Sequence, residues 1–324
     1  MGEVKKLHRP PLERVVIVDP VHEDAIALLS QEFEVEVRLY PSEDELLELL
    51  ERADIVVLRS GVRLSATVIQ AAPRLRIIAR AGVGLDNIDI DAARAAGIAV
   101  FNVPDATTRA VAEFAIGLIL ALARKIPQAD AAMRAGRWEK PQLEGVELQG
   151  RALGVVGFGR IGSEIGALGR AIGMQVIAAV STSSSARRDA LASAGVQLTD
   201  LRDLLCSADV VCLAVPLTPQ THGLIGRDEL GMMKPGSYLV NVARGDVVNT
   251  QAVCDALRSG QLAGAALDVY GEDSGSVPLA SLANVVLTPH IGAMTVEAQR
   301  RVATALVRSI AAARDGEHDP HRIC

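Results

Sequence analysis

A segment with closely spaced glycines constrains the fold of this chain more than any other feature. Residues 150–162 read Gly-Arg-Ala-Leu-Gly-Val-Val-Gly-Phe-Gly-Arg-Ile-Gly, an apolar strand and a turn followed by a helical pattern that continues to residue 172. In such a turn Gly157 allows the tight bend, Gly159 lets a pyrophosphate approach the backbone, and Gly162 lets the helix pack on its strand. The segment predicts a phosphate-binding turn at a helix N-terminus. The alternative is that the glycines serve helix–strand packing alone.

Length and composition favour two domains of the α/β class. The chain has 324 residues, more than one typical core accommodates, and 49% of them are hydrophobic but only 2% aromatic. Cores of small and branched aliphatic side chains are typical of buried parallel strands that alternate with helices. We predict strands at 15–18, 35–39, 55–58, 75–78, 98–100, 153–157, 175–180, 196–198, 210–214, 237–241, 265–269 and 285–287.

The order of these elements indicates a discontinuous first domain. Its N-terminal part alternates short strands with amphipathic helices, one of which opens with a capping box of Ser42 and Glu45. A long helix at 107–125 leads toward the glycine turn, and a helix at 295–313 has an apolar face that can return to the first domain. We predict a substrate domain of residues 1–103 plus 295–324 and a nucleotide-binding Rossmann domain of residues 104–294.

Charge and targeting signals exclude several classes of protein. The formal net charge is −6 and no basic patch with interleaved aromatic residues occurs, so we predict no nucleic-acid partner. The longest apolar run, 110–123, is interrupted by Glu113 and is shorter than the roughly 20 residues that span a bilayer. Residues 1–9 lack the apolar core of a signal peptide, and the four cysteines have no CxxC spacing. We therefore predict a cytoplasmic protein with no membrane segment and no metal site.

Several short blocks follow one another in a fixed order. They are Arg-Ala-Gly-Val-Gly-Leu-Asp-Asn-Ile-Asp at 80–89, Val-Ala-Glu at 111–113, the glycine turn, Pro-Leu-Thr at 216–218 with Thr221, Asn-Val-Ala-Arg-Gly at 241–245, Ala-Leu-Asp-Val at 266–269 and Thr-Pro-His-Ile-Gly at 288–292. In this order the chain resembles the D-isomer-specific 2-hydroxyacid dehydrogenases, which include D-3-phosphoglycerate dehydrogenase, hydroxypyruvate and glyoxylate reductases and the C-terminal binding protein corepressors. The likeness covers nearly the whole chain. Since the sequence stops at Cys324, we expect a short form without the C-terminal regulatory domain of the longer phosphoglycerate dehydrogenases.

The resemblance implies a fold, a reaction and an assembly. The fold consists of two parallel-sheet domains, Rossmann-like or flavodoxin-like, with the active site in the cleft between them. The reaction is reversible hydride transfer between a nicotinamide cofactor and C2 of a small 2-oxo or 2-hydroxy acid. The assembly is a homodimer formed through the segment 107–149.

The resemblance also assigns the residues of the substrate site. Arg244 would hold the substrate carboxylate and polarise its C2 oxygen, because a planar guanidinium makes parallel hydrogen bonds. His290 would donate or accept the C2 proton, because its unperturbed pKa lies nearest neutrality. The backbone N–H groups of Val83 and Gly84 would complete the carboxylate site, and Arg59 would reach a distal group of the substrate. The alternatives are a structural histidine at 290 and surface ion pairs for the arginines, which residue type alone favours at Arg59.

The expected cofactor contacts all lie in the predicted nucleotide-binding domain. The resemblance assigns to Asp268 a contact with the nicotinamide amide. Thr108 and Thr221 have helix capping as an equal alternative. The full set is Thr108, Gly157, Gly159, Arg160, Ile161, Ser181, Pro216, Thr221, Val242, Ala243, Asp268 and Gly292.

The acid that partners the catalytic histidine departs from the family pattern. The family places a Glu five residues after the Asp of the Ala-Leu-Asp-Val block, where it raises the pKa of the histidine by stabilising the imidazolium. Here that position is Asp273, preceded by Glu272. An aspartate reaches about 1.5 Å less far than a glutamate. Asp273 with an adjusted loop, Glu272 in its place, or an impaired pair are the three alternatives.

The adenosine ribose site also departs from the NAD-preferring pattern. Those relatives carry an acidic residue at the end of the second nucleotide-domain strand, which binds the 2′-hydroxyl and repels a 2′-phosphate. Here Val180 stands at that position, followed by Ser181 and further hydroxyl residues and then by Arg187 and Arg188. This sequence favours NADP(H), with NAD(H) as the second choice. The alternative is a solvated loop with an N-cap serine and no selectivity.

Three functions compete on this evidence. The first is an NAD(P)-dependent 2-hydroxyacid dehydrogenase that acts as a 2-oxoacid reductase, with Arg244 and His290 as its evidence. The second is a cofactor-sensing, corepressor-like interaction protein, which an impaired acid–histidine pair would suit. The third is a relative that acts on a phosphonate-type substrate.

Overall fold

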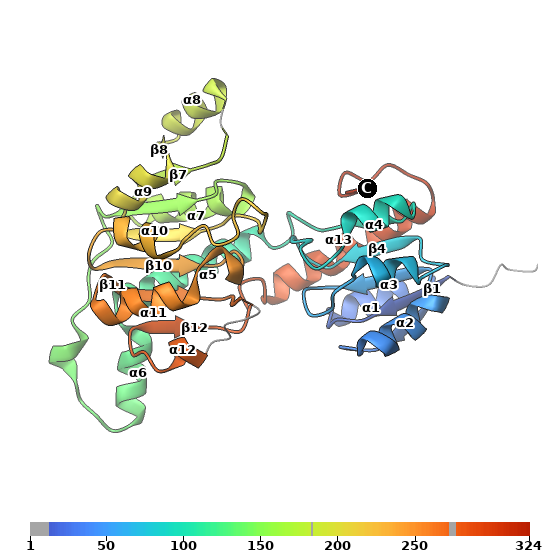
Figure 1. Cartoon of the computed structure of the whole chain (residues 1–324), viewed down its shortest axis with the longest axis horizontal. Coiled ribbons are helices and arrows are strands. Elements are labelled where there is room, and N and C mark those ends of the chain that lie inside the picture. The colour runs from blue at the N-terminus through green and yellow to red at the C-terminus, as the bar shows by residue number, and fades with distance from the viewer. Residues whose placement is uncertain (1–12, 183, 272–276) are drawn as a thin grey trace, which may run out of the picture. The chain divides into compact units, whose positions relative to one another are not determined.

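The computed structural model describes residues 13–182, 184–271 and 277–324. The chain forms two compact units (Figure 1). Unit 1 comprises Met1–Thr107 with Thr295–Cys324, and unit 2 comprises Thr108–Met294. All pairs between neighbouring strands of the described part are parallel, which confirms the predicted fold class of two parallel-sheet α/β units.

Unit 1 contains a five-stranded sheet in the order β2-β1-β3-β4-β5. This is the doubly wound order in which β1 and β3 lie side by side although β2 separates them in the sequence. Its strands are β1 (Arg14–Ile17), β2 (Glu34–Val37), β3 (Ile55–Leu58), β4 (Ile77–Arg80) and β5 (Ala99–Phe101); its helices are α1 (Glu23–Leu29), α2 (Glu43–Arg52), α3 (Ala66–Gln70), α4 (Ile90–Ala95) and α13 (Val296–Arg314).

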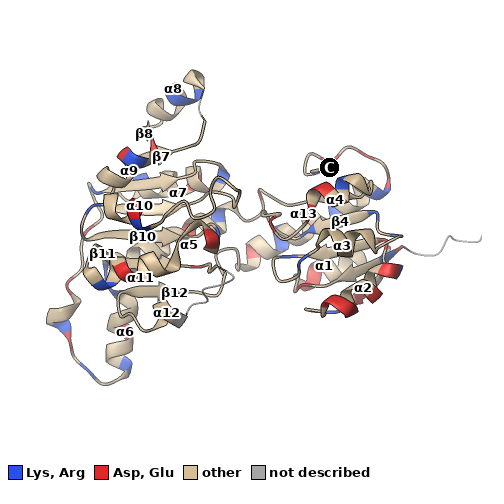
Figure 2. Ribbon diagram, viewed as in Figure 1, with Lys and Arg blue, Asp and Glu red and all other residues tan. Residues whose placement is uncertain are grey.

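Both faces of this sheet are buried, because successive side chains of a strand point to opposite faces. Val15 and Ile17 of β1 pack in one core with α1 and α13. Val16 and Val18 pack in the other core with α2, α3 and α4. The predicted capping box is present at α2, where Ser42 and Glu45 exchange hydrogen bonds, and acidic side chains gather along this helix (Figure 2).

Unit 2 contains a seven-stranded sheet in the order β12-β11-β10-β9-β6-β7-β8. The chain runs from β6 outward to β8 and then returns to β9 on the other side of β6. The strands are β6 (Ala152–Val156), β7 (Gln175–Ala179), β8 (Val196–Thr199), β9 (Val210–Leu213), β10 (Ser237–Asn241), β11 (Leu262–Leu267) and β12 (Val285–Leu287).

Helices cover both faces of this second sheet as well. One core joins the sheet to α5 and α7, and the other joins it to α9, α10 and α11. The helices are α5 (Thr108–Ala123), α6 (Ile126–Arg134), α7 (Arg160–Ala171), α8 (Ser185–Ser193), α9 (Leu201–Ser207), α10 (Arg227–Met232), α11 (Thr250–Ser259) and α12 (Val277–Ala280), with 3₁₀ turns η1 (Lys140–Leu143) and η2 (Gly245–Val247).

One strand lies two residues later than its apolar pattern predicts. The expected strand at 75–78 is β4, which continues to Arg80 because Arg80 still pairs with Leu58 of β3. A charged residue is expected at the surface, but Arg80 is buried, so the sequence pattern did not place it in the strand.

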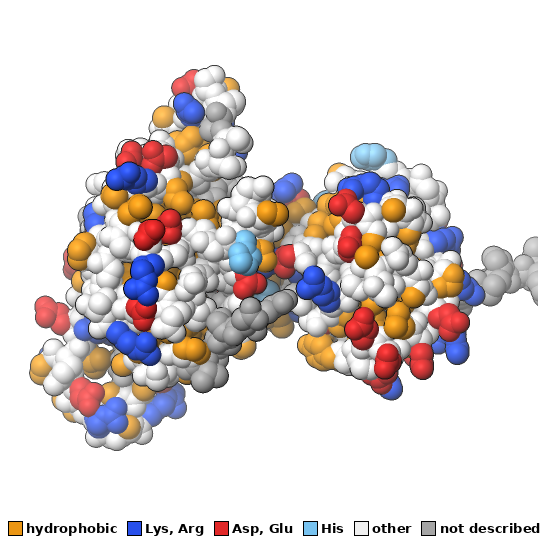
Figure 3. Space-filling view, viewed as in Figure 1, with side chains coloured by type: hydrophobic (Ala, Val, Ile, Leu, Met, Phe, Trp, Pro, Cys, Tyr) orange, Lys and Arg blue, Asp and Glu red, His pale blue; other side chains and the backbone are white. Residues whose placement is uncertain are grey.

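Hydrophobic side chains on the face in Figure 3 are scattered among polar and charged ones. None of the described helices has the length and apolar character needed to cross a bilayer.

Candidate active site

The predicted residues of unit 2 follow neighbouring strands at one edge of the sheet. Because all these strands are parallel, their carboxyl ends meet at the same edge, where open α/β sheets bind ligands. Adjacent strands are about 4.8 Å apart, so the ends of β12 to β7 cover about 24 Å. In sheet order the residues are His290 after β12, Asp268 after β11, Arg244 after β10, Pro216 after β9, Gly157 after β6 and Ser181 after β7.

The three glycines of the turn after β6 have different reasons to be glycine. Gly157 has a φ of +88°, and its N–H donates to the Ala179 carbonyl at 2.9 Å. A side chain at Gly162 would overlap the Gly157 carbonyl. Gly159 has an ordinary φ of −82°, and a Cβ there would meet no protein atom within 4 Å. The protein therefore needs glycine at 157 and 162 for its own packing, whereas at 159 the absent side chain leaves open space.

The helix that follows this turn begins without a side-chain cap. Gly159 is the N-cap of α7 and has no side chain to accept the N–H groups of its first turn. In contrast, Asp200 caps α9 and Asn249 caps α11 through their side chains. A helix N-terminus that no side chain caps is a favourable place for an anion.

The segment after β7 brings an arginine to the glycine turn. Ala179 pairs with Val156, so Val180 and Ser181 follow at the level of the turn. Helix α8 follows, and its N-cap Ser184 accepts the Arg187 N–H at 3.2 Å. An N-cap serine in this loop was part of the alternative without cofactor selectivity. The Arg187 guanidinium donates to the Phe158 carbonyl at 2.6 Å.

A buried asparagine shapes the turn that carries Arg244. The Asn241 amide donates to the Arg244 carbonyl at 2.9 Å and accepts the Ala243 N–H at 3.0 Å. The Arg244 guanidinium donates to the Ala243 carbonyl at 2.7 Å, and this side chain is half-buried. Asn241 is fully buried, and its role in the turn was not anticipated from the sequence.

The Arg244 turn packs closely on the chain that follows β11. A Cβ at Gly245 would overlap the backbone of Tyr270 and Gly271, so only glycine fits. Asp273 and Glu272 lie outside the described residues. The pairing of one of these two carboxylates with His290 therefore stays a prediction.

Asp268 holds the turn that carries His290. Its side chain is 2% exposed, and Oδ1 accepts the Thr288 hydroxyl at 2.7 Å and the Ile291 N–H at 2.9 Å. Oδ2 accepts the Gly292 N–H at 2.8 Å, and the Asp268 carbonyl accepts the His290 N–H at 2.9 Å. These four bonds fix the backbone on both sides of the histidine.

The backbone conformation of His290 explains why so many bonds converge there. Its φ is +56°, and the side chain is exposed. A non-glycine residue in this left-handed region costs roughly 1–2 kcal/mol. The bonds to Asp268 offset that cost, so Asp268 positions His290. The expected contact of Asp268 with a nicotinamide amide stays a prediction, and Oδ2, which accepts one hydrogen bond here, has the capacity for a second.

Tyr270 adds a second support that sequence reasoning missed. Its hydroxyl lies 3.1 Å from the Leu267 carbonyl and 3.0 Å from the Thr288 carbonyl. A tyrosine hydroxyl is protonated at neutral pH, and burial raises the pKa of this one. The ring thereby connects the end of β11 to the start of the histidine turn.

Thr108 and Thr221, for which helix capping was an equal alternative to cofactor binding, lie in different local structures. Thr221 lies in a turn after β9, where its hydroxyl donates to the Pro216 carbonyl at 2.6 Å and accepts the Thr218 N–H at 2.8 Å. It therefore stabilises a turn and does not cap a helix. Thr108 is the first residue of α5.

In unit 1 the predicted substrate residues follow two neighbouring strands. Arg59 comes directly after β3, and Val83 and Gly84 follow β4. Asn102 donates to the Val83 carbonyl at 2.7 Å. Among the described residues, no protein acceptor takes the N–H of Val83 or of Gly84. Two adjacent N–H groups of this kind suit a carboxylate.

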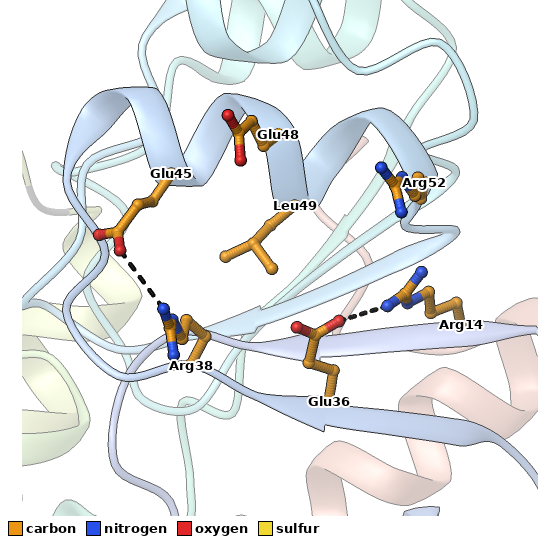
Figure 4. A pocket seen from close by; sticks show the side chains of 7 residues that line it. All are labelled: Arg14, Glu36, Arg38, Glu45, Glu48, Leu49 and Arg52. Atoms are coloured by element: carbon orange, nitrogen blue, oxygen red, sulfur yellow. Dashed lines mark hydrogen bonds and ion pairs between the residues drawn. The ribbon is translucent and has the colours of Figure 1, made fainter.

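A separate charged pocket of unit 1 lies between α2 and the strands β1 and β2 (Figure 4). Across it the arginines form ion pairs, Arg14 with Glu36 and Arg38 with Glu45. The lining residues are Arg14, Glu36, Arg38, Glu45, Glu48, Leu49 and Arg52. Three carboxylates balance three guanidinium groups, so the pocket offers no net charge to an ion. No group of His, Cys, Asp and Glu side chains with the makings of a metal site occurs in the described part of the chain.

Comparison with known proteins indicates the family to which the chain belongs. Residues 116–292 match the model of the D-isomer specific 2-hydroxyacid dehydrogenase, NAD binding domain. The D-3-phosphoglycerate dehydrogenase of Methanocaldococcus jannaschii is 43% identical over 306 residues, which are 94% of this chain and 58% of that protein. This chain thus spans little more than half the length of that relative.

Two further proteins match over almost their whole length. The hydroxypyruvate reductase of Thermotoga maritima is 42% identical over 92% of this chain and 97% of its own. The crystal structure of the NADPH-dependent glyoxylate/hydroxypyruvate reductase of Sinorhizobium meliloti, in complex with NADP and malonate, has a TM-score of 0.85 and 28% identity, over 96% of this chain and 97% of its own. The match to the family model and the shared sequence show that the chain belongs to the D-isomer-specific 2-hydroxyacid dehydrogenase family.

Proposed function

We propose that this protein is an NAD(P)-dependent 2-hydroxyacid dehydrogenase that works as a reductase of small 2-oxo acids. The observation that carries the proposal is the histidine turn. Asp268 holds His290 in a strained backbone conformation at the sheet edge that also bears Arg244 and the glycine turn. Strain of this kind persists where the surrounding structure fixes it, and it is frequent at active sites.

The residues at the sheet edge fit a nicotinamide dinucleotide. The open space at Gly159 and the α7 N-terminus without a side-chain cap suit its pyrophosphate. When bound, the cofactor supplies the hydride. The residues proposed to hold it are Thr108, Gly157, Gly159, Arg160, Ile161, Ser181, Pro216, Thr221, Val242, Ala243, Asp268 and Gly292.

The protein's own side chains then bind and protonate the substrate. Arg244 binds the carboxylate and the C2 oxygen, and the N–H groups of Val83 and Gly84 complete the carboxylate site. As C2 is reduced, its oxygen gains negative charge, which Arg244 stabilises and to which His290 donates a proton. Asp273 or Glu272 would favour the protonated form of His290.

A preference for NADP(H) over NAD(H) is part of the proposal. Val180 offers no carboxylate to repel a 2′-phosphate. The hydrogen bond between Arg187 and the Phe158 carbonyl supports it, because it keeps a guanidinium beside the glycine turn. Ser181 is an exposed hydroxyl in the same region.

Homodimerisation is also proposed, through the segment 107–149. Large apolar side chains in this segment are exposed: Leu120, Ile126 and Met133 by 39–54%, and Trp138 by 78%. Exposed apolar side chains of this size are typical of protein contacts. Light scattering of the purified protein, compared with the variant Trp138→Arg, tests the dimer.

The enzymatic proposal is tested by initial rates of NADPH and NADH oxidation with glyoxylate, hydroxypyruvate and phosphonopyruvate. We expect turnover of at least one acid and, with NADPH, a rate on the order of tenfold higher. Binding of both cofactors without turnover of any acid would favour the cofactor-sensing function instead. Turnover of the phosphonate alone would favour the phosphonate-type relative.

A matched pair of variants isolates the phosphate site. Arg187→Ala should remove most of the preference for NADPH, whereas Arg188→Ala should change it less, because only the Arg187 guanidinium donates to the glycine turn in the described structure. Equal effects of the two substitutions would contradict the assignment of Arg187.

A further inference from the structure

The loop that follows β4 is held by hydrogen bonds to two of its carbonyl groups. The Gly82 carbonyl accepts the Val103 N–H at 3.0 Å, and the Val83 carbonyl accepts the side-chain amide of Asn102 at 2.7 Å. Gly82 is buried, and Val83 and Gly84 are half-buried. Both donors come from the segment directly after β5, the strand beside β4. Two consecutive peptide groups of the loop are therefore fixed from the neighbouring strand end.

These two bonds set the direction of the N–H groups in the same peptide groups. A trans peptide group is planar, and its carbonyl oxygen and its N–H point in opposite directions. Both peptide groups of the loop are trans. The bond to the Gly82 carbonyl thus directs the Val83 N–H away from Val103. The bond to the Val83 carbonyl likewise directs the Gly84 N–H away from Asn102.

The loop presents donors on one side while its acceptors are used on the other. Neither the Val83 N–H nor the Gly84 N–H has an acceptor in the described part of the chain. Backbone N–H groups that are shielded from solvent are nearly always paired with protein, water or a ligand. Successive backbone N–H groups form a site for an anion. Since both carbonyl oxygens are bound elsewhere, neither is turned toward such an anion.

Asn102 itself is held in a well-supported position. It directly follows β5, the last strand of the sheet, and is 8% exposed. Its own N–H donates to the His321 carbonyl at 3.4 Å, and the Ile323 N–H donates to the Val100 carbonyl at 2.8 Å. The segment 321–323 thus pairs with the chain along β5. A buried side chain on such a support gives up little further freedom when a ligand binds.

From these contacts we infer that Asn102 is a positioning residue for the substrate carboxylate. Its amide fixes the Val83 carbonyl and thereby aims the Gly84 N–H at the carboxylate. The inference rests on the proposed function, in which the N–H groups of Val83 and Gly84 bind that group. It deepens the function by naming the side chain that orients one of the two donors. Because all 2-oxo acids share the carboxylate, Asn102 acts equally on each of them.

The first test is Asn102→Ala, which frees the Val83 carbonyl and leaves the Val103 bond in place. We expect KM for glyoxylate and for hydroxypyruvate to rise by the same factor of about tenfold, the effect of one lost hydrogen bond to a charged group. The kcat should change by less than about threefold, because the carboxylate is bound alike before and during the reaction. The KM for NADPH should change by less than about twofold.

A binding measurement separates this effect from turnover. Oxamate has the carboxylate and the neighbouring carbonyl group of a 2-oxo acid but is not reduced. Its Kd for the complex of the protein with NADPH, measured by calorimetry, should rise in Asn102→Ala by the same factor as KM. An unchanged Kd together with an unchanged KM would overturn the inference. A fall in kcat at unchanged KM would also overturn it, since Asn102 would then act on the chemical step.

A second variant distinguishes hydrogen bonding from packing. Asn102→Leu fills about the same space as asparagine and has no donor. If the amide aims the Gly84 N–H, the leucine variant should show the same tenfold rise in KM as the alanine variant. Wild-type KM in Asn102→Leu would mean that Asn102 only fills space and would contradict the inference. If Asn102→Ala does not fold, Asn102→Leu takes its place in the kinetic and calorimetric measurements.

Gln261 provides the matched control. Its side-chain amide also donates to backbone carbonyl groups, those of Leu230 at 3.0 Å and Met233 at 2.7 Å, at the amino edge of the sheet in unit 2. Gln261→Ala should lower Tm as Asn102→Ala does and leave KM for both acids unchanged. Wild-type protein that turns over no 2-oxo acid would refute the proposed function. Wild-type turnover with an unchanged KM in both Asn102 variants would refute the inference alone.

Discussion

The loop 59–62 in unit 1 and the turn 288–292 in unit 2 are built on the same plan. Each follows a strand of a parallel sheet, and each is held by a buried aspartate that follows the neighbouring strand. Asp19, after β1, binds the loop after β3 through three N–H groups on one oxygen. Asp268, after β11, binds the turn after β12 through two N–H groups and a hydroxyl on both oxygens.

The two regions differ in the type of residue that occupies their most constrained position. In the loop 59–62 that position is Gly61, where a side chain would overlap Asp19. In the turn 288–292 the residue with the unfavourable backbone is His290, at a φ of +56°. A protein avoids such strain by using glycine, unless the side chain itself is required. The comparison teaches that Asp268 binds the backbone around His290, the proposed proton donor, in a conformation that glycine would adopt freely.

The largest expected effect separates the side chain of His290 from its backbone. His290→Asn should lower kcat by roughly 10²–10⁴-fold, because proton transfer is lost. Asparagine tolerates the left-handed conformation, so Tm and cofactor affinity should stay near those of the wild type. Steady-state kinetics and thermal unfolding measure both. A kcat within threefold of the wild type would show that His290 does not transfer the proton to the substrate.

The next effect tests whether Asp268 positions the turn. Asp268→Asn should reduce kcat on the order of 100-fold, since a displacement of about 1 Å at the reacting group has that consequence. The control is Asp209→Asn in the same unit, because Asp209 accepts the Ala152 N–H at 2.8 Å at the amino edge of the sheet. Similar losses of kcat in both variants would mean a general loss of stability and would contradict a positioning role.

A third effect contrasts a glycine needed for packing with one that faces open space. Gly61→Ala should lower the free energy of unfolding by about 1–3 kcal/mol, because the new methyl group overlaps Asp19 and Tyr40. Gly159→Ala meets no protein atom and should leave unfolding unchanged while it weakens cofactor binding. Denaturant titrations and cofactor fluorescence measure the two quantities. Equal destabilisation by both substitutions would contradict the proposed reason for Gly159.

The smallest effect measures the strain at 290 directly. Among variants that all lack the imidazole, His290→Gly should be more stable than His290→Ala by about 1 kcal/mol, because alanine pays the left-handed penalty and glycine does not. At Gly61, where φ is not positive, no such preference arises from the backbone. Urea denaturation of the two variants gives the difference. An alanine variant as stable as the glycine variant would show that the turn relaxes.

Local sequence patterns predicted most of the fold. The apolar runs at 55–58 and 237–241 coincide with β3 and β10, and the capping box at Ser42 lies at the start of α2. These features depend on residues within one turn or one strand of each other. The position of Arg80 in β4 was not predicted, because a charged residue is expected at the surface. Arg80 is buried and pairs with the neighbouring strand β3, which its local sequence does not indicate.

The sequence by itself determined the family, the parallel sheets and the glycine turn, because these rest on short motifs and on local periodicity. Only the tertiary structure decided which side chains hold the site. Asp19 reaches Arg59 across 40 residues because β1 lies beside β3 and not only beside β2. Asp268 reaches Ile291 and Gly292 because β11 pairs with β12. A hydrogen bond between distant residues depends on strand order, and strand order is set by how the whole chain packs.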